Sequence, residues 1–501
     1  MNSQAPRVRI GALVGVYLVL LVVALAFVAT HRGPWLDEYW TLWLTDRTLT
    51  AGELWERWSI DVHPPLYVAL VHAAAAWAPL SVDQGRLLNF VPLAGLLAAA
   101  AFIAREPAMR RFTVLFLLGV TSSVMFVTYF AELRSYFLGM CTFAVVMLCL
   151  RRLSEPIPGA GFGWGVWTVF FVALLLCLNV HFITALITAL IVGVFGLRFL
   201  LAGRTGDFLR IALMGIAACV PMLGFFIRNH EVIQANAGTW ITTSTPKAAA
   251  FIIFVVGLAA LGQIVVLLLA GNELLRQWRE GRLAATVRSG RIDVALLTSL
   301  GIALAAIVLL AYHARHAIVQ DRYVLTLGVA ALAVVANLGE LAAFDRRWVR
   351  GAVMATSVLL LIGAAGVRAS EPRWYGPAAR VKELLAACPT SRVVARELNP
   401  SPVYGEDRVR VLAHAMMARD VGLPLADLET KPIESPPGRC PDIVWIPHTD
   451  TGPIPAGAEG QAAYFTSWNP DYAGARISME IFGRNAAVVV ARRAGLGVSP
   501  P

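Results

Sequence analysis

Charged residues are scarce in this chain. Asp, Glu, Lys and Arg make up 15% of its 501 residues, while hydrophobic residues make up 58%. A soluble globular protein contains about 25% charged and about 45–50% apolar residues. The apolar excess lies within residues 10–367, in runs of roughly 18–22 residues, the length that crosses about 30 Å of hydrocarbon. The composition excludes an ordinary soluble protein and predicts a multi-pass membrane protein.

Several motifs of metal, redox and nucleotide enzymes are also absent. The sequence contains no Cys-x-x-Cys pair, no cluster of Cys and His at metal-ligand spacing and no glycine-rich phosphate loop. Of the six cysteines, only Cys388 and Cys440 lie outside the apolar runs. Such a pair can form a disulfide in an oxidising compartment, so its state depends on the side of the membrane that it faces.

The net charge of +10 comes largely from Arg residues in the short segments between apolar runs. Basic domains often bind nucleic acid. Here the positive-inside rule explains the same charges, because Lys and Arg collect in the cytoplasmic loops of membrane proteins. We therefore expect no nucleic-acid partner and use the Arg clusters to assign the sides of the membrane.

The apolar runs predict about eleven transmembrane helices. They cover roughly residues 10–30, 86–104, 112–130, 135–150, 164–180, 182–200, 210–228, 248–270, 293–312, 323–343 and 351–367. A further apolar stretch, residues 64–80, is short and begins with His-Pro-Pro. If it crossed the membrane, every later Arg cluster would lie outside, so we expect an interfacial helix there.

This topology puts the N-terminus in the cytoplasm and the C-terminal tail in the periplasm. Residues 1–367 are expected to form a transmembrane catalytic domain, with interfacial helices in the first external loop, residues 31–85. Residues 368–501 are more polar and rich in Pro and Gly, and predict a small α/β periplasmic domain. Its helix is expected at 376–388 and its strands at 391–396, 442–446 and 486–491.

The polar residues that gather at the outer boundary are the functional candidates, because ionisable side chains are costly to bury in a membrane protein. They are Asp37, Glu38, His63, Tyr67, Arg86, Glu132, Arg134, Tyr136, His181, Arg322 and Tyr323. A vicinal acid pair can deprotonate a hydroxyl or hold a divalent cation such as Mg²⁺ or Mn²⁺. Arg and His can bind phosphate, and aromatic rings can stack on sugars. The set suits sugar transfer from a lipid phosphate.

The order of these motifs along the chain carries a family resemblance. Asp37-Glu38 follows the first span, His63-Pro64-Pro65-Leu66-Tyr67 closes the loop, Arg86 opens the second span, and Glu132-x-Arg134-x-Tyr136 precedes the fourth. Over about residues 10–345 the chain resembles the GT-C superfamily of polyprenyl-phosphate-sugar-dependent glycosyltransferases. Within it, the chain is similar to the protein mannosyltransferase-like group, which includes lipid A aminoarabinose transferases and rhizobial lipopolysaccharide galacturonosyltransferases.

The resemblance implies a GT-C-like all-α fold and a role for individual residues. Asp37 matches the acid that acts as base or orients the acceptor, with Glu38 beside it. His63 matches a Lys near the carrier phosphate in aminoarabinose transferases, and the change makes the charge pH-dependent. Arg134 and Arg322 look like phosphate-side residues. Tyr323 completes an Arg-Tyr pair, and His181 matches a recurrent His at the outer end of a middle span.

The implied activity is inverting transfer of a sugar from a polyprenyl-phosphate carrier to a hydroxyl of a periplasmic acceptor. The acceptor can be lipid A, another cell-envelope glycan or a protein, and the enzyme itself is expected in the inner membrane. The sequence specifies neither the donor sugar nor a metal requirement, and it leaves the oligomeric state open.

Structural roles compete with these assignments. The acids at 37 and 38 suit the first turn of a helix, the His-Pro-Pro sequence suits a rigid turn, and Glu132 and Arg134 suit an ion network. A transporter or lipid flippase is the alternative function, and it predicts charges near the bilayer midplane and paired half-helices. The sequence instead collects charges at one boundary. A membrane scaffold with a sensory tail would leave that outer cluster unexplained.

Overall fold

The structure is a computed structural model. It describes residues 10–59, 61, 63–155, 163–240, 243–282, 291–341, 347–371, 375–395, 416–418, 422–423, 440–446, 455–482 and 486–492. The chain forms two compact units. The first contains Met1–Thr30, Leu49–Ala74 and Gly85–Arg368, and the second contains His31–Thr48, Ala75–Gln84 and Ala369–Pro501.

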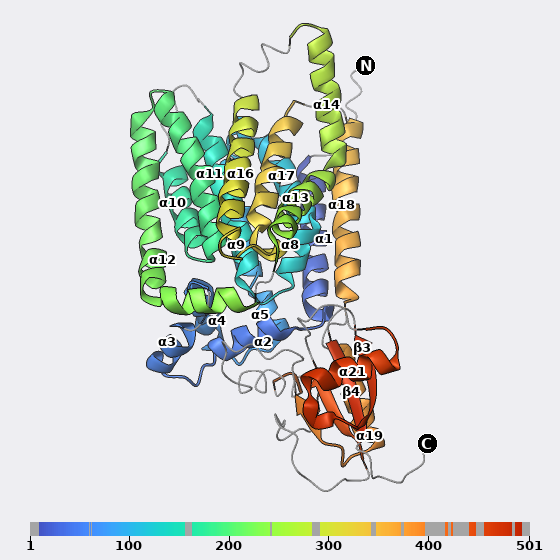
Figure 1. Cartoon of the computed structure of the whole chain (residues 1–501). Helices are drawn as coiled ribbons and strands as arrows, with labels where there is room; N and C mark the ends of the chain where they lie inside the picture. The colour runs from blue at the N-terminus through green and yellow to red at the C-terminus, as the bar shows by residue number, and fades with distance from the viewer. Residues whose placement is uncertain are drawn as a thin grey trace. The chain divides into compact units, whose positions relative to one another are not determined.

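The first unit is a helical bundle (Figure 1). Its long single helices are α1 (Ile10–His31), α6 (Phe90–Ile103, preceded by α5, Val82–Leu87), α9 (Ser135–Ser154), α11 (Phe182–Leu201), α12 (Thr205–Trp240), α16 (Arg291–His313) and α18 (Arg347–Ala369). Within the described residues, these seven are long and apolar enough to cross a membrane, α6 together with α5. Shorter apolar helices are α4 (Leu66–Ala75), α10 (Trp164–Leu178) and α17 (Leu325–Gly339).

Two bent helix pairs pass the same test of length and composition, each as one broken span or one re-entrant loop. The pair α7 (Arg110–Ser122) and α8 (Val124–Phe130) bends by 61°, and the pair α13 (Thr245–Leu261) and α14 (Ile264–Arg279) bends by 75°. Each predicted span therefore corresponds to one helix or one bent pair. The helical membrane architecture that the sequence predicts is confirmed.

The two bends meet inside the bundle. The Oγ of Ser123 accepts a hydrogen bond from the backbone N–H of Phe126 and so caps α8 after the break. At the other break, Nε2 of Gln263 donates to Oγ of Ser122 at 3.4 Å. Broken helices are tolerated inside a membrane where neighbouring side chains satisfy the backbone groups that are set free. The break at Ser123 follows this rule, and the side chain of Gln263 links the second break to the first.

The centre of the bundle is formed by α9 and α17. An 18-residue window of α9 is 94% buried, in keeping with a helix that is apolar on all sides. It packs against α6, α10 and α17, and α17 also packs against α7, α13 and α16. Gly328 of α17 permits a close approach, because a Cβ there would lie 2.8 Å from Cε of Met125 and 3.1 Å from Cγ1 of Val255. Small residues serve this purpose at helix interfaces in membranes.

The first external loop contributes short helices, as expected from the sequence. Helix α3 (Ala51–Ser59) packs on α12, where the Trp55 ring lies edge-on to Phe225 and the guanidinium of Arg228 lies 5.0 Å from the Trp55 ring. Helix α4 has 10 residues and so spans about 15 Å, half the hydrocarbon thickness. This length fits the interfacial helix predicted at residues 64–80.

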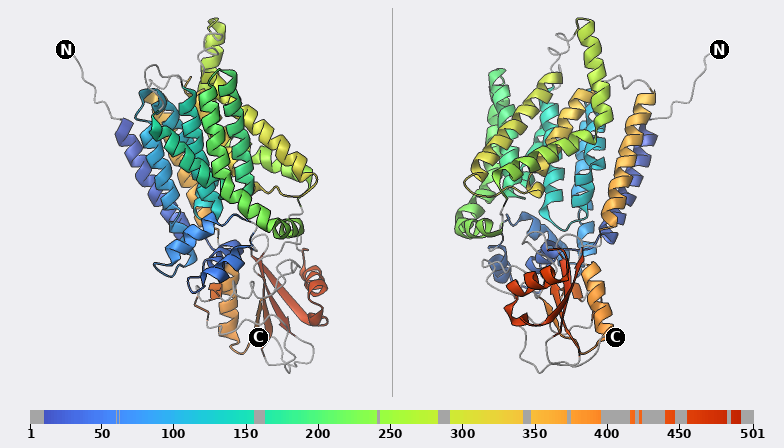
Figure 2. Two further views of the ribbon diagram at one scale, coloured as in Figure 1. Left: turned by 90° about the vertical axis from the view of Figure 1, so that its left-hand side faces the viewer. Right: turned by 45° about the vertical axis from the view of Figure 1, so that its right-hand side comes forward.

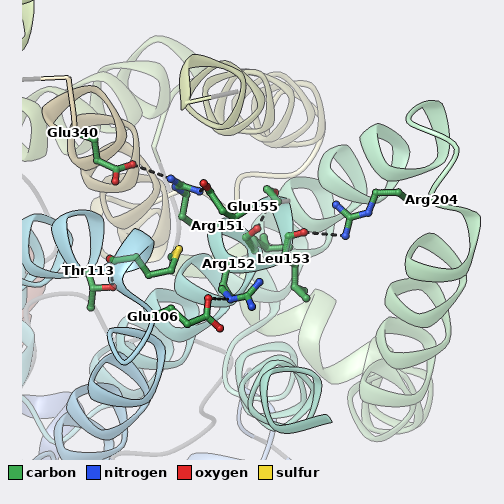
Figure 3. Close-up of polar contacts among 11 residues, drawn as sticks. Glu106, Thr113, Arg151, Arg152, Leu153, Glu155, Arg204 and Glu340 are labelled. Carbon is green, nitrogen blue, oxygen red and sulfur yellow. Dashed lines mark hydrogen bonds and ion pairs between the residues drawn. The ribbon is translucent and has the colours of Figure 1, made fainter. Parts of the chain in front are cut away.

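Figure 3 shows a network of ion pairs at the C-terminal end of α9. Arg151 pairs with Glu155 and, at 2.9 Å, with Glu340 after α17. Arg152 pairs with Glu106, which precedes the turn η1 (Pro107–Met109). The sequence analysis placed the notable charges at one boundary, so this second group of buried charges was missed. Its Arg residues have carboxylate partners, which identifies the network as a structural clamp.

The second unit contains a four-stranded sheet with strand order β1-β2-β4-β3. The strands are β1 (Val393–Ala395), β2 (Asp442–Ile446), β3 (Arg476–Phe482) and β4 (Ala486–Arg492). The helices are α2 (Leu36–Leu44), α19 (Tyr375–Ala387) and α21 (Ala458–Trp468), and the turn η4 (Pro470–Tyr472) follows α21. Strands β1 and β2 are parallel, and β4 is antiparallel to both of its neighbours.

The sheet is covered on both faces (Figure 2). Val444 and Val489 are paired in register and pack with Phe465 of α21 in one buried cluster. Helix α19 packs on β2 and β4. The small α/β fold predicted for the tail is confirmed, including α19 and three of its strands. Strand β3 and helix α21 were not predicted.

Two cross-links hold this unit together. Cys388 and Cys440 form a disulfide, so the pairing that the sequence left open is present. Arg32 pairs with Glu371 at 3.0 Å, and the backbone N–H of Gly33 donates to the carbonyl of Glu371. The chain segment after α1 is thereby fixed to the segment after α18.

We predict that Glu340→Gln lowers the free energy of unfolding by about 1–3 kcal/mol, because a buried guanidinium loses a charged acceptor while keeping Glu155. Thermal unfolding in detergent measures the loss. The matched control is Glu273→Gln, since Glu273 pairs with the more exposed Arg276, and it should cost less than about 1 kcal/mol. Equal losses for the two variants would contradict a clamp role for Glu340.

Candidate functional site

Four connections between helices of the first unit bring four aromatic rings together. His63 lies between α3 and α4, Tyr136 begins α9, His181 precedes α11, and Tyr323 ends the turn η2 (Asp321–Tyr323) before α17. The ring of His181 has its centroid 5.1 Å from that of His63, 5.6 Å from that of Tyr136 and 4.8 Å from that of Tyr323. All four side chains are buried. We call these four residues the ring cluster.

Two arginines flank the ring cluster. Arg134 is the extended N-cap residue of α9, and its guanidinium carbon lies 6.0 Å from the Tyr136 ring. Arg322 belongs to η2, and its guanidinium carbon lies 5.6 Å from the Tyr323 ring. Cations over aromatic faces are held by the ring quadrupole. Both predicted phosphate-side arginines therefore lie beside the predicted His and Tyr residues.

His181 is held in one tautomer by its position as N-cap of α11. Its backbone is extended, with φ −163°, and its Nδ1 accepts a hydrogen bond from the backbone N–H of Ile183 at 3.2 Å. A ring nitrogen that accepts carries no proton, so the neutral ring is protonated on Nε2. Nδ1 of His181 therefore has a structural role, because it caps α11. The Nε2–H group is the ring's hydrogen-bond donor.

The electrostatic environment of His181 is positive. Burial lowers the pKa of His181 well below its usual value of 6.5, and the neighbouring His63, Arg134 and Arg322 lower it further. His181 is therefore neutral at pH 7. The groups that disfavour a positive charge on His181 favour a negative charge beside it. The ring cluster therefore suits a phosphate or another oxyanion.

His63 has a carboxylate partner that the sequence analysis did not select. Nδ1 of His63 lies 3.2 Å from Oδ1 of Asp61, and both side chains are buried. The Asp-x-His spacing is the available signal, because residues two apart in an extended segment point to the same side. His63 precedes Pro64, which favours an extended backbone at His63.

Glu132 is buried, and its segment is fixed by another residue that was missed. Nδ2 of Asn89 donates to the backbone carbonyls of Phe130 and Glu132 at 2.8 Å and 2.9 Å. Asn89 precedes α6, so it ties the start of that helix to the end of α8. A hydrogen bond over such a separation in sequence leaves no local signal.

Arg86 is fully buried at the end of α5, and its Nη1 donates to the carbonyl of Ala29 at 3.0 Å. This contact anchors α1. The predicted contact between Arg86 and the substrate stays a prediction.

The loop that leads to Arg322 is organised by a further histidine. Nδ1 of His313 accepts hydrogen bonds from the backbone N–H groups of Ile318 and Val319 at 2.9 Å and 3.0 Å. Its Nε2 donates to the carbonyl of Thr243 at 2.9 Å. Both ring nitrogens of His313 form hydrogen bonds with backbone groups. This histidine therefore fixes the loop before Arg322 and is not part of the ring cluster.

A mostly apolar groove adjoins this region. Its volume is about 710 Å³, and its walls come from α4, α6, α9 and α10. Tyr67, in the first turn of α4, lines it together with Asn89 and Leu138, and Phe102 lines it near the other end of α6. The groove therefore follows the length of α6, a helix of 14 residues or about 21 Å. Such a shape fits a hydrocarbon chain.

Asp37 and Glu38 belong to the second unit, in the first turn of α2. The Oε2 of Glu38 accepts a hydrogen bond from the backbone N–H of Trp35 at 3.3 Å, so Glu38 caps this helix. Glu38 is fully buried, whereas Asp37 is half-buried. The catalytic roles of both acids stay predictions.

A metal requirement also stays open. In the part of the chain that the structure describes, no group of three or more His, Cys, Asp and Glu side chains is arranged to hold a metal ion. Asp61 and His63 form a pair, and a divalent cation bound there would need further ligands from a substrate or water.

The units define a polytopic membrane protein with a GT-C-like fold and a small α/β part. Two solved structures of ArnT from Cupriavidus metallidurans share this fold, and each alignment covers 98% of this chain and 99% of the other. The form bound to undecaprenyl phosphate has a TM-score of 0.52 at 14% identity, and the apo form 0.53 at 13%. No family model matches the sequence, and no curated protein matches it.

We predict that His181→Asn makes folding less sensitive to acid. Asn keeps an oxygen acceptor at the N-cap position. In the wild type, the pKa of His181 is lowered by folding, so below about pH 6.5 the unfolded chain binds a proton that the folded chain does not. The free energy of unfolding then falls by up to about 1.4 kcal/mol per pH unit. Thermal unfolding between about pH 7.5 and about pH 5.5 should show a smaller loss for the variant, and parallel curves would contradict the prediction.

Proposed function

We propose that this protein is a glycosyltransferase that moves a sugar from a polyprenyl-phosphate carrier to an acceptor hydroxyl at the outer face of the membrane. The observation that carries the proposal is the ring cluster with its two flanking arginines, beside a long apolar groove. A lipid phosphate combines these two properties in one molecule, with an anionic head and a hydrocarbon chain. The shared fold with ArnT, one form of which binds undecaprenyl phosphate, supports the same carrier class.

The proposed placement of the donor follows the charges. Arg134, Arg322 and His63 bind the carrier phosphate, and the groove that begins at Tyr67 takes the first part of the polyprenyl chain. The aromatic rings of Tyr136 and Tyr323 offer a shelf for the sugar. Glu132 lies in the same segment as Arg134 and helps to orient it.

The proposed reaction is a single displacement. The acceptor oxygen attacks the anomeric carbon, its proton passes to Asp37, and the bond from the anomeric carbon to the phosphate oxygen breaks. The polyprenyl phosphate leaves with the electron pair, and the guanidinium groups stabilise the charge that develops on it. A single displacement inverts the anomeric configuration. The acceptor class comprises lipid A, other envelope glycans and proteins.

The disulfide supports the proposed orientation. Disulfides persist in oxidising compartments such as the periplasm and are rare in the cytosol. Cys388 and Cys440 lie after the last span, so the pair favours a periplasmic C-terminal part and a cytoplasmic N-terminus.

We predict that Asp37→Asn lowers sugar transfer by at least about 100-fold, the contribution typical of a general base. Purified protein is assayed with a panel of polyprenyl-phosphate sugars, with and without a chelator. Asp46→Asn in the same chain segment is the matched control and should keep wild-type turnover. Near wild-type turnover by Asp37→Asn would remove this residue from the mechanism.

We further predict that Cys388 and Cys440 react with a membrane-impermeant maleimide after treatment of spheroplasts with an impermeant reductant. Glu280→Cys in a chain with Ser at both positions marks the cytoplasmic side, because residue 280 lies in an Arg-rich loop. Labelling of Cys388 and Cys440 only after lysis would contradict the proposed orientation.

A transporter or lipid flippase is the second candidate, and the two bent helix pairs favour it, since transporters use discontinuous helices. The residues at these breaks, Ser122, Ser123 and Gln263, are neutral. Proteoliposomes distinguish the two functions. Movement of the lipid-linked sugar across the bilayer without covalent transfer would favour transport.

A further inference from the structure

We propose that Asp61 is a positioning residue for the transfer reaction, which it serves by holding His63 with the Nε2 edge of its ring free for the carrier phosphate. This inference rests on the proposed function. Neither the sequence candidates nor the shared fold assigned Asp61 a role. Its basis is the contact between two buried ionisable side chains at the edge of the ring cluster.

The backbone explains why these two side chains meet. Helix α3 ends at Ser59, and the backbone N–H of Asp61 donates to the carbonyl of Trp58, which closes a turn. Pro64 and Pro65 follow His63 and lead into α4 at Leu66. Proline fixes its own φ and restricts the residue before it, so His63 is held between a turn and a rigid segment.

The hydrogen bond then fixes the imidazole ring. Nδ1–H of His63 donates to Oδ1 of Asp61 at 3.2 Å, which is the arrangement that sets a histidine tautomer. Among the described residues, Nε2 of His63 has no hydrogen-bond partner in the structure. That nitrogen is therefore the one available to a ligand.

Two rings of the cluster lie next to His63. The centroid of the His63 ring lies 5.1 Å from that of His181 and 6.4 Å from that of Tyr136. Arg134 and Arg322 act, together with His63, on the same His181 ring. Asp61 thus supplies a carboxylate at Nδ1 of His63, at the edge of a cluster that two guanidinium groups flank.

This arrangement has a consequence for the leaving group. In the protonated form of His63, Nδ1–H donates to Asp61 and Nε2–H donates to a phosphate oxygen. Negative charge grows on that oxygen as the bond to the sugar breaks, so the second hydrogen bond is strongest in the transition state. Without Asp61 the ring can turn, and its positive charge has no counter-ion.

The test compares Asp61→Ala and Asp61→Asn with Glu56→Gln, an exposed acid-to-amide change in the preceding helix. The probes are the polyprenyl-phosphate sugar that the wild type uses and the polyprenyl phosphate alone. For Asp61→Ala we expect kcat to fall by about 10- to 100-fold, the range for loss of a charge-assisted hydrogen bond, with the donor KM little changed. Asp61→Asn keeps a neutral acceptor and should lose less. Glu56→Gln should match the wild type.

A double variant separates positioning from a general structural effect. If Asp61 acts through His63, then Asp61→Ala combined with His63→Gln is no slower than His63→Gln alone. Losses that multiply would overturn the inference, as would wild-type kcat in Asp61→Ala. Size-exclusion and thermal unfolding verify that each variant is folded, and Asp61→Asn replaces Asp61→Ala if the latter does not fold.

The outcomes also distinguish this inference from the proposed function. If the wild-type protein neither binds polyprenyl phosphate nor transfers sugar from any donor in the panel, the proposed function fails and the role of Asp61 fails with it. If the wild type is active and the Asp61 variants are equally active, only the role of Asp61 is overturned.

Discussion

Hydrocarbon offers no hydrogen-bond partner to a backbone group and no compensation to a charge, and this constraint arranges the first unit. Backbone groups are satisfied within helices, and the irregular segments within the bundle, at the two breaks, carry the neutral side chains of Ser122, Ser123 and Gln263. Helix α9 shows the result most clearly. Its N-terminal end carries Arg134 and Tyr136, its C-terminal end carries Arg151 and Arg152, and the buried, largely apolar residues 137–150 separate them.

The same constraint explains how far the fold follows from the sequence. Hydropathy reports the length of an apolar run, so each predicted span coincides with one helix or one bent pair. Helices α10 and α17, with 15 residues each, are shorter than the predicted spans. A bend changes no apolar residue. The breaks at Ser123 and near Gln263 depend on capping and on contact between the two breaks, which hydropathy does not register. In the tail, β3 was missed because it pairs on one side only and alternates between partly buried and exposed residues.

The sequence predicted which residues lie at the site, but it did not predict their hydrogen-bond partners. His63, Tyr136, His181 and Tyr323 were selected because each lies beside an apolar helix at the outer boundary, and helices that end together bring such residues together. Asp61, Asn89 and His313 act through hydrogen bonds to another segment or to the backbone. Asn89 reaches carbonyls 41 and 43 residues away, and no property of Asn89 alone reveals them. Of these three residues, only Asp61 could have been found from a local sequence signal, which is the Asp-x-His spacing before two prolines.

The two ends of α9 place their arginines in different surroundings. At the C-terminal end, Arg151 and Arg152 pair with Glu340, Glu155 and Glu106. At the other end, His63, Arg134 and Arg322 oppose a positive charge on the buried His181. The same groups would stabilise an anion bound beside them. Because the groove beside it is mostly apolar, the anion that fits best carries a hydrocarbon chain.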